Sequence, residues 1–145
     1  MASNERCALV LWGAACDEAV AAIFVTRLRA AGLRVWVVGI SGRRIAGSHG
    51  LRIQPDLLPQ QALALTRQVG CVVFPCPESL LARFQNDPTV DVLLRSVAAG
   101  QAQFVVPATC TEHLLAYTSA LLIYPPIEML VPFVKVLAET LTSIP

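Results

Sequence analysis

Charged side chains are scarce in this chain. Asp, Glu, Lys and Arg make up 14% of its 145 residues, and hydrophobic residues make up 55%, whereas charged residues form about a quarter of a typical soluble domain. This composition excludes an intrinsically disordered chain, because disorder requires many charges and few apolar residues. We expect another subunit to cover part of the surface, although a small sheet buried on both faces would also consume apolar residues.

The chain also lacks an excess of charge of either sign. Its net charge is +1, and lysine occurs once, at Lys135, against ten arginines. No long-range field would therefore steer it to nucleic acid or to an anionic lipid surface. The pair Arg43–Arg44 lies in a turn rich in Gly and Ser without interleaved aromatic residues, which is typical of a solvated loop. The sequence predicts no nucleic-acid partner.

Long apolar runs and targeting signals are missing as well. The apolar, uncharged run at residues 114–127 is too short to span a bilayer and contains Pro125 and Pro126. The first six residues are polar, and the apolar run behind them is typical of a strand rather than of a signal peptide. We therefore predict no membrane span and a cytoplasmic location.

Metal and cofactor motifs are absent from the sequence too. Its two histidines are far apart, and none of its five cysteines forms a C-x-x-C pair, so no zinc spacing exists. The sequence has no phosphate loop and no dinucleotide fingerprint. We predict no metal and no cofactor, and a reducing compartment for an odd number of thiols: Cys7, Cys16, Cys71, Cys76 and Cys110.

What the sequence does contain is an alternation of buried strands and amphipathic helices. Strands are predicted at residues 7–12, 33–39, 69–74, 104–107 and 121–124, with a short extra strand at 51–53. Helices are predicted at 17–31, in part of 56–68, at 88–99 after the capping Asp87, at 111–119 and beyond the prolines around 130–141. This order predicts a single α/β domain over residues 1–145, a flavodoxin-like three-layer sandwich with a mostly parallel sheet and helices on both faces.

Ligand sites in such sheets lie at the carboxyl ends of the strands. Residues 75–78 and 108–112 follow two of the predicted strands, and they include Cys76 and Cys110. Chemistry is therefore expected in these two segments.

Four segments resemble the ThiJ/PfpI superfamily, which has the class I glutamine-amidotransferase-like fold. They are ALVLWG at 8–13, RLRAAGLRV at 27–35, SHGLRIQPDL at 48–57 and CVVFP at 71–75. The resemblance covers most of the chain, and the order of the motifs carries it. It implies an enzyme site with a cysteine on a strained strand-to-helix turn, a nearby histidine, a glutamate from the first helix region and an oxyanion hole of backbone N–H groups.

Each part of that implied site is altered here. The resemblance places Pro77 where the family has the second glycine of Pro-Gly-Gly, and proline has no N–H to donate. Counting without gaps puts Ala108 at the nucleophile position, and allowing two inserted residues puts Cys110 there. His113 lies three residues past Cys110 on the same helical face, but the segment that carries the family's histidine is shortened. The glutamate position falls on Glu18, or on Asp17 or Val20 in other registers.

Three functions follow from these residues. The first is a non-catalytic ThiJ/PfpI-like protein that acts as a protein-interaction module, as a homo-oligomer or as a subunit of a larger assembly. The second is a cysteine-dependent hydratase, deglycase or amidohydrolase with Cys110 as nucleophile, His113 as base and Glu18 as auxiliary acid. The third is a thiol redox sensor that uses Cys76 and Cys110, two thiols at neighbouring strand ends. The altered site favours the first.

Overall fold

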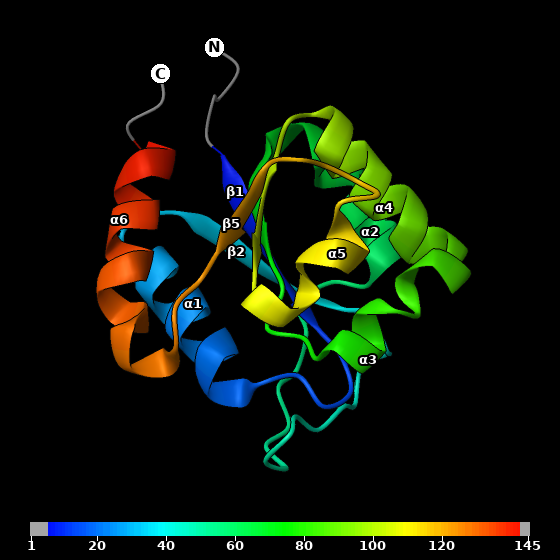
Figure 1. The fold of residues 1–145 in the computed structure, drawn as a ribbon, viewed down its shortest axis with the longest axis horizontal. Coiled ribbons are helices and arrows are strands. Elements are labelled where there is room, and N and C mark those ends of the chain that lie inside the picture. Colours follow the sequence, from blue (N-terminus) through cyan, green and yellow to red (C-terminus); the bar gives the residue numbers. More distant parts are fainter. Residues whose placement is uncertain (1–5, 143–145) are drawn as a thin grey trace.

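In the computed structural model, which describes residues 6–142 apart from the side chain of Gln85, five parallel strands form one sheet between two layers of helices (Figure 1). The strands are β1 (Cys7–Trp12), β2 (Arg34–Gly39), β3 (Val69–Val73), β4 (Gln103–Val106) and β5 (Leu121–Ile123). They lie in the order β2-β1-β3-β4-β5, which is the flavodoxin-like order. The strands are all parallel, and the direction in which the chain adds strands to the sheet reverses between β1 and β3. The predicted fold class is confirmed.

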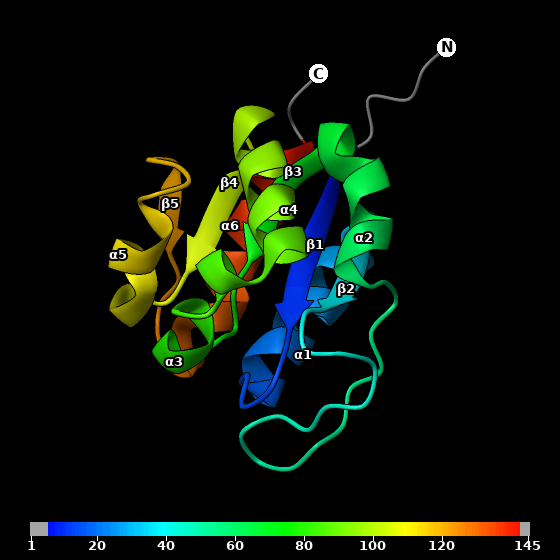
Figure 2. The same cartoon turned by 90° about the vertical axis from the view of Figure 1, so that its right-hand side faces the viewer.

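The helices divide between the two faces of this sheet (Figures 1 and 2). One face carries α1 (Glu18–Ala30) and α6 (Leu130–Thr142), which pack on each other. The other face carries α2 (Pro59–Ala62), α3 (Glu78–Leu81), α4 (Pro88–Ala99) and α5 (Thr111–Leu114). Short 3-10 turns at Leu63–Gln68, Phe84–Asn86, Ala108–Cys110 and Ile127–Met129 complete the connections.

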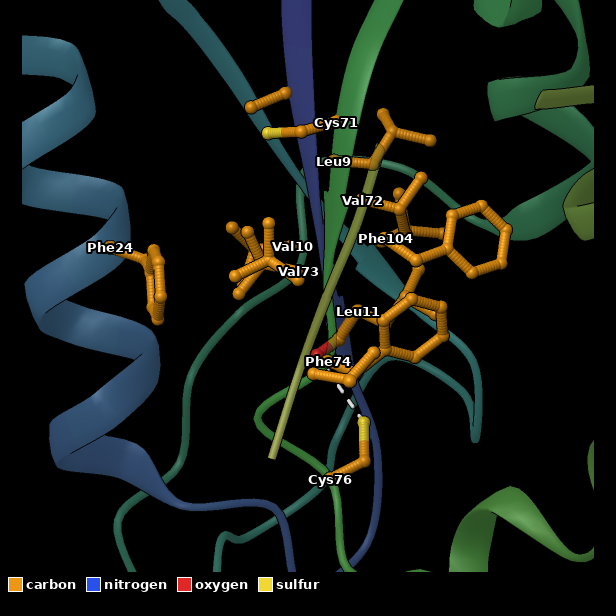
Figure 3. Close-up of a cluster of buried hydrophobic side chains, with 14 of the residues drawn as sticks. Leu9, Val10, Leu11, Phe24, Cys71, Val72, Val73, Phe74, Cys76 and Phe104 are labelled. Atoms are coloured by element: carbon orange, nitrogen blue, oxygen red, sulfur yellow. Dashed lines mark hydrogen bonds between the residues drawn. The ribbon is translucent and has the colours of Figure 1, made fainter. Parts of the chain in front are cut away.

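The central strands are apolar on both faces because both faces are covered. Every residue of β1 and of β3 is buried, as expected for a parallel sheet between helix layers. Figure 3 shows the two halves of the core: Phe24 of α1 faces Val10 and Val73 on one side of the sheet, while Phe74 and Phe104 lie on the other. The two phenylalanine rings of that second side are 5.2 Å apart.

Helix ends follow the capping residues in the sequence. The Asp17 carboxylate accepts the Val20 N–H at 3.1 Å and starts α1. The Asp87 carboxylate accepts the Thr89 N–H at 3.1 Å and starts α4. Gly32, just past the end of α1, has φ +92°, a left-handed conformation that glycine adopts without strain.

Two predicted elements are shorter than expected. The helix predicted for 111–119 ends at Leu114, and Cys110 rather than Thr111 occupies its N-cap position. The chain then turns early because it must return to β5, and the Tyr117 hydroxyl donates to Asp91 of α4 at 2.6 Å on the way. The strand predicted for 51–53 is a single antiparallel bridge between Ala46 and Arg52.

Within residues 6–142, no helix is both long and apolar enough to cross a membrane.

Candidate functional site

Three cysteines meet at the carboxyl edge of the sheet. Cys16 follows β1, Cys76 follows β3 and Cys110 ends the turn after β4. Because these strands are neighbours in the order β1-β3-β4, the segments that leave them converge. All three side chains are buried, with exposures of 0%, 4% and 0%. The predicted location of the site is where these thiols lie, and we name the three the thiol crevice.

Cys76 lies at the centre of the thiol crevice. Its Sγ is 3.3 Å from the Sγ of Cys16 and 3.9 Å from the carbonyl oxygen of Leu11, the contact drawn as a dashed line in Figure 3. The Sγ of Cys110 is 3.7 Å from the carbonyl oxygen of Cys76. Cys76 therefore pairs sulfur to sulfur with Cys16, whereas Cys110 contacts its backbone.

Short backbone contacts hold the segments of the crevice together. The Asp17 N–H donates to the carbonyl oxygen of Pro75 at 2.8 Å, which joins the start of α1 to the end of β3. The Gly13 N–H donates to Cys16 Sγ at 3.2 Å. From β5, the Tyr124 hydroxyl donates to the carbonyl oxygen of Phe74 at 3.2 Å. Two loops and the residue after β5 thus hold the thiols in place.

Cys110 is an inward-facing thiol in an unstrained turn. Burial raises its pKa, the contact with the Thr109 hydroxyl opposes that rise, and the negative charge of Glu78 adds to it. The non-glycine residues with positive φ in residues 6–142 are Ala15 and Gln101, so neither Ala108 nor Cys110 adopts the left-handed backbone of a strained elbow. Ala108, which follows Pro107 after the end of β4, is exposed and has no reactive group.

His113 interacts with a carboxylate rather than with the thiol three residues before it. Its Nε2 lies 3.2 Å from Glu78 Oε1 of α3. The Cys110 sulfur instead contacts the Thr109 hydroxyl, at 3.6 Å, and the Cys76 carbonyl. No hydrogen bond joins the predicted nucleophile Cys110 to the predicted base His113 among these described residues, and the role of His113 stays a prediction.

Glu18 is buried and anchors the loop between β2 and α2. Its carboxylate accepts the N–H groups of His49 at 2.8 Å and Leu51 at 2.9 Å. The Ser48 hydroxyl donates to it at 3.2 Å, and the His49 ring nitrogen Nδ1 lies 3.3 Å away. The contacts of the carboxylate are with this loop, and its predicted role as an auxiliary acid remains untested.

The hydrogen bonds to Glu18 outweigh the cost of burying it. Burial alone would raise the pKa of this carboxyl group, but the N–H donors of the loop and the His49 ring stabilise the charged form and lower the pKa to about 2. Glu18 is therefore ionised in the folded protein near neutral pH.

Sequence reasoning missed Cys16 and His49. A signal for Cys16 existed: it comes four residues after a buried strand, and Cys76 comes three residues after the strand that adjoins it in a flavodoxin-like order. No comparable signal pointed to His49, because the path of its loop back to α1 is not encoded in any local pattern.

Metal binding by these residues finds no support in their arrangement. Across the part of the chain that the structure describes, no group of three or more His, Cys, Asp or Glu side chains is placed to hold a metal ion.

Comparison with solved structures identifies the fold. The chain is similar to DJ-1beta of Drosophila melanogaster, with a TM-score of 0.77 and 20% identity over 97% of this chain and 92% of that one. It is similar to an oxidized DJ-1 of Toxoplasma gondii, with a TM-score of 0.74 and 16% identity over 92% and 89% of the two chains. A putative protease I of Bacteroides thetaiotaomicron has a TM-score of 0.76 at 10% identity, over 94% and 99%.

These likenesses are of structure more than of sequence. No family model matches the sequence, and no curated protein matches it. The chain therefore has the DJ-1/ThiJ/PfpI fold, as its motifs predicted.

Proposed function

We propose that this chain is a non-catalytic protein of the DJ-1/ThiJ/PfpI fold that acts by binding protein, as a homo-oligomer or as a subunit of a larger assembly. The separation of the three candidate catalytic groups carries the proposal. Cys110 contacts Thr109 and the Cys76 backbone, His113 pairs with Glu78, and Glu18 is bound by the loop at 47–51. A nucleophile, its base and its orienting group accelerate a reaction as a unit, so separating them removes the rate enhancement.

The state of the thiol supports the same proposal. A cysteine that acts as the nucleophile on a carbonyl or amide substrate is partly exposed so that the substrate can reach it, and its pKa is lowered because the thiolate is the nucleophile. Cys110 has 0% exposure, and burial raises its pKa. In addition, Pro77 occupies the N-cap position just before α3 and offers no N–H for an oxyanion.

Apolar side chains on the surface support a binding role. Among residues 6–142, eight large hydrophobic residues are exposed, and five of them lie on β5, on the turn after it or on α6: Ile123, Ile127, Met129, Val131 and Val136. β5 is also an edge strand of the sheet, and edge strands offer backbone groups for pairing with another chain. All five cysteines are free thiols, which suits the cytoplasm as the place of action.

Size-exclusion chromatography with light scattering tests the binding role. We expect one of two results. Either the mass in solution is two or more times the 15.6 kDa of one chain, or a second protein co-purifies in fixed proportion when the chain is isolated from its own cells. A monomer that retains this mass at high concentration, and that isolates alone, would contradict the proposal.

An activity assay separates the proposal from a thiol enzyme. The parent chain and its Cys110→Ala variant are assayed for conversion of methylglyoxal and for amidase activity, with Cys7→Ala as a control for loss of a buried thiol. We expect no turnover by any of the three. Turnover by the parent and by Cys7→Ala, lost in Cys110→Ala alone, would establish Cys110 as a nucleophile and overturn the non-catalytic reading.

A further inference from the structure

The sulfur atoms of Cys16 and Cys76 are in contact although the residues are 60 positions apart in the sequence. Their separation is 3.3 Å, and a disulfide bond joins sulfurs at about 2.05 Å. Closing that gap requires a movement of a little over 1 Å (3.3 minus 2.05), which falls on two loop residues rather than on the ladder of the sheet. The movement would therefore leave the strand pairing of the sheet unchanged.

The two sulfurs are hydrogen-bonded to each other and to the backbone. The Cys16 S–H donates to Cys76 Sγ at 3.3 Å, and the Gly13 N–H donates to Cys16 Sγ at 3.2 Å. Burial is the largest cause that raises the pKa of Cys76, and the hydrogen bond with Cys16 adds to it. The pair is therefore already placed for a bond between its own two sulfurs rather than for a reaction with a third thiol.

Two other buried thiols lack this arrangement. Cys7 of β1 and Cys71 of β3 lie within the sheet, where Cys71 stands opposite Ala8 rather than opposite Cys7. Burial raises the pKa of Cys7 to about 11 and that of Cys71 to about 12. They are as buried as the crevice pair but belong to hydrogen-bonded strands, so they serve as internal controls.

We propose that Cys16 and Cys76 form a reversible two-cysteine site that reacts with hydroperoxides to give an intramolecular disulfide. One thiol of the pair, as its thiolate, attacks one peroxide oxygen: an S–O bond forms, the O–O bond breaks, and the leaving oxygen takes up the thiol proton to give water or an alcohol. The second thiol then attacks the oxidised sulfur: the S–S bond forms, the S–O bond breaks, and the released hydroxide takes the proton of the second thiol. The two sulfurs lose two electrons in total, and the peroxide gains them.

The bond would join the loop after β1 to the segment after β3. These segments already touch through the hydrogen bond from Asp17 N–H to Pro75 O at 2.8 Å. A disulfide there makes the junction covalent and leaves Cys110 reduced, because the Cys110 sulfur faces the Cys76 carbonyl and not its sulfur. The site is independent of the proposed binding function, since a monomer and an oligomer both contain it.

Peptide mapping after oxidation tests the proposal. The full chain is treated with hydrogen peroxide, its remaining free thiols are alkylated, and it is digested with trypsin without reductant. We expect a loss of about 2 Da before digestion and three alkylated cysteines in place of five. The peptides 7–27 and 68–83 should migrate as one cross-linked species that separates on reduction.

Each of the two tryptic peptides contains two cysteines: Cys7 and Cys16 share one, and Cys71 and Cys76 share the other. The bond is therefore assigned in a Cys7→Ala/Cys71→Ala variant. Should that variant not fold, fragment-ion spectra of the parent assign it. The cross-link should persist in this variant and in Cys110→Ala, and should vanish in Cys16→Ala and in Cys76→Ala. A bond between Cys76 and Cys110, a bond between two molecules, oxidation confined to Cys110, or five thiols that remain free would each overturn the proposal.

Discussion

Glu18 shows how a single buried carboxylate organises the chain around the site. Its oxygens accept the N–H groups of His49 and Leu51, and Gly47 lies so close to the carboxylate that a β-carbon there would overlap it. The loop between β2 and α2 is therefore closed onto the start of α1 by one side chain. A buried charge is stable only when such donors surround it.

Replacing Glu18 with Gln should release this loop. Gln keeps the shape of the side chain, but it removes the charge and turns an N–H donor toward the N–H groups of the loop. We expect trypsin to cleave the folded variant after Arg52 several-fold faster than the parent. Glu112→Gln, which changes an exposed carboxylate on α5, should leave the cleavage rate unchanged; equal rates for Glu18→Gln and the parent would contradict the anchoring role.

Acid should open the same loop at a low pH. The folded pKa of Glu18 is about 2, below its ordinary value of 4.5, so protonation favours the released form. Its contribution to stability is complete above about pH 4.5 and is lost as the pH falls toward 2. The amide NMR signals of His49 and Leu51 should report this transition, and a midpoint at or above 4.5 would contradict the assigned hydrogen bonds.

Among the elements, α4 depends on its first residues. Asp87 accepts the N–H groups of Thr89 and Val90 at 3.1 and 3.3 Å, and Pro88 occupies the first helical position. Asp87→Ala removes an N-cap and should lower the free energy of unfolding by about 1 kcal/mol. Asp87→Asn retains an oxygen acceptor and should lose much less in urea unfolding, whereas equal losses in both variants would show that the cap is not the cause.

The contact of α1 with α6 and β5 centres on Phe24. Its ring is edge-on to Tyr124 with centroids 5.5 Å apart, and edge-on to Phe133 at 6.4 Å. Phe24→Ala should reduce the free energy of unfolding by about 3–5 kcal/mol, because a fully buried ring leaves a cavity. Val136→Ala on the exposed side of α6 should change it by less than about 0.5 kcal/mol, and a comparable effect of the two would contradict this packing.

For the whole molecule, assembly should depend on the face that carries β5 and the start of α6. Ile123 and Met129 are 51% and 60% exposed there. If this face binds a second copy, Ile123→Lys and Met129→Lys should each shift the mass in light scattering toward the monomer without lowering the melting temperature, since neither side chain is in the core. Charge at a buried apolar interface costs binding free energy.

Val92→Lys is the matched control for assembly. Val92 is 49% exposed on α4, in the opposite helix layer, and its substitution should leave the mass unchanged. A mass that responds equally to all three substitutions, or to Val92→Lys alone, would place the interface elsewhere.

Local patterns in the sequence were enough to predict the layers of this fold. Residues 7–12 and 69–73 contain no polar side chain at any position, as expected of strands that helices cover on both faces. Asp87 followed by Pro88 marked the start of α4 to the residue. The helix predicted for 111–119 was too long, because its end depends on the return to β5 and on the contact of Tyr117 with Asp91, both distant in sequence.

The sequence by itself determined the order of strands and helices, and with it the edge where Cys76 and Cys110 gather, because periodicity and capping act over a few residues. Only the tertiary structure decided which groups touch: Cys16 beside Cys76, His113 beside Glu78, and Glu18 beneath the loop at 47–51. These contacts join residues some 30 to 60 positions apart, and their geometry follows from how whole elements pack rather than from any local spacing.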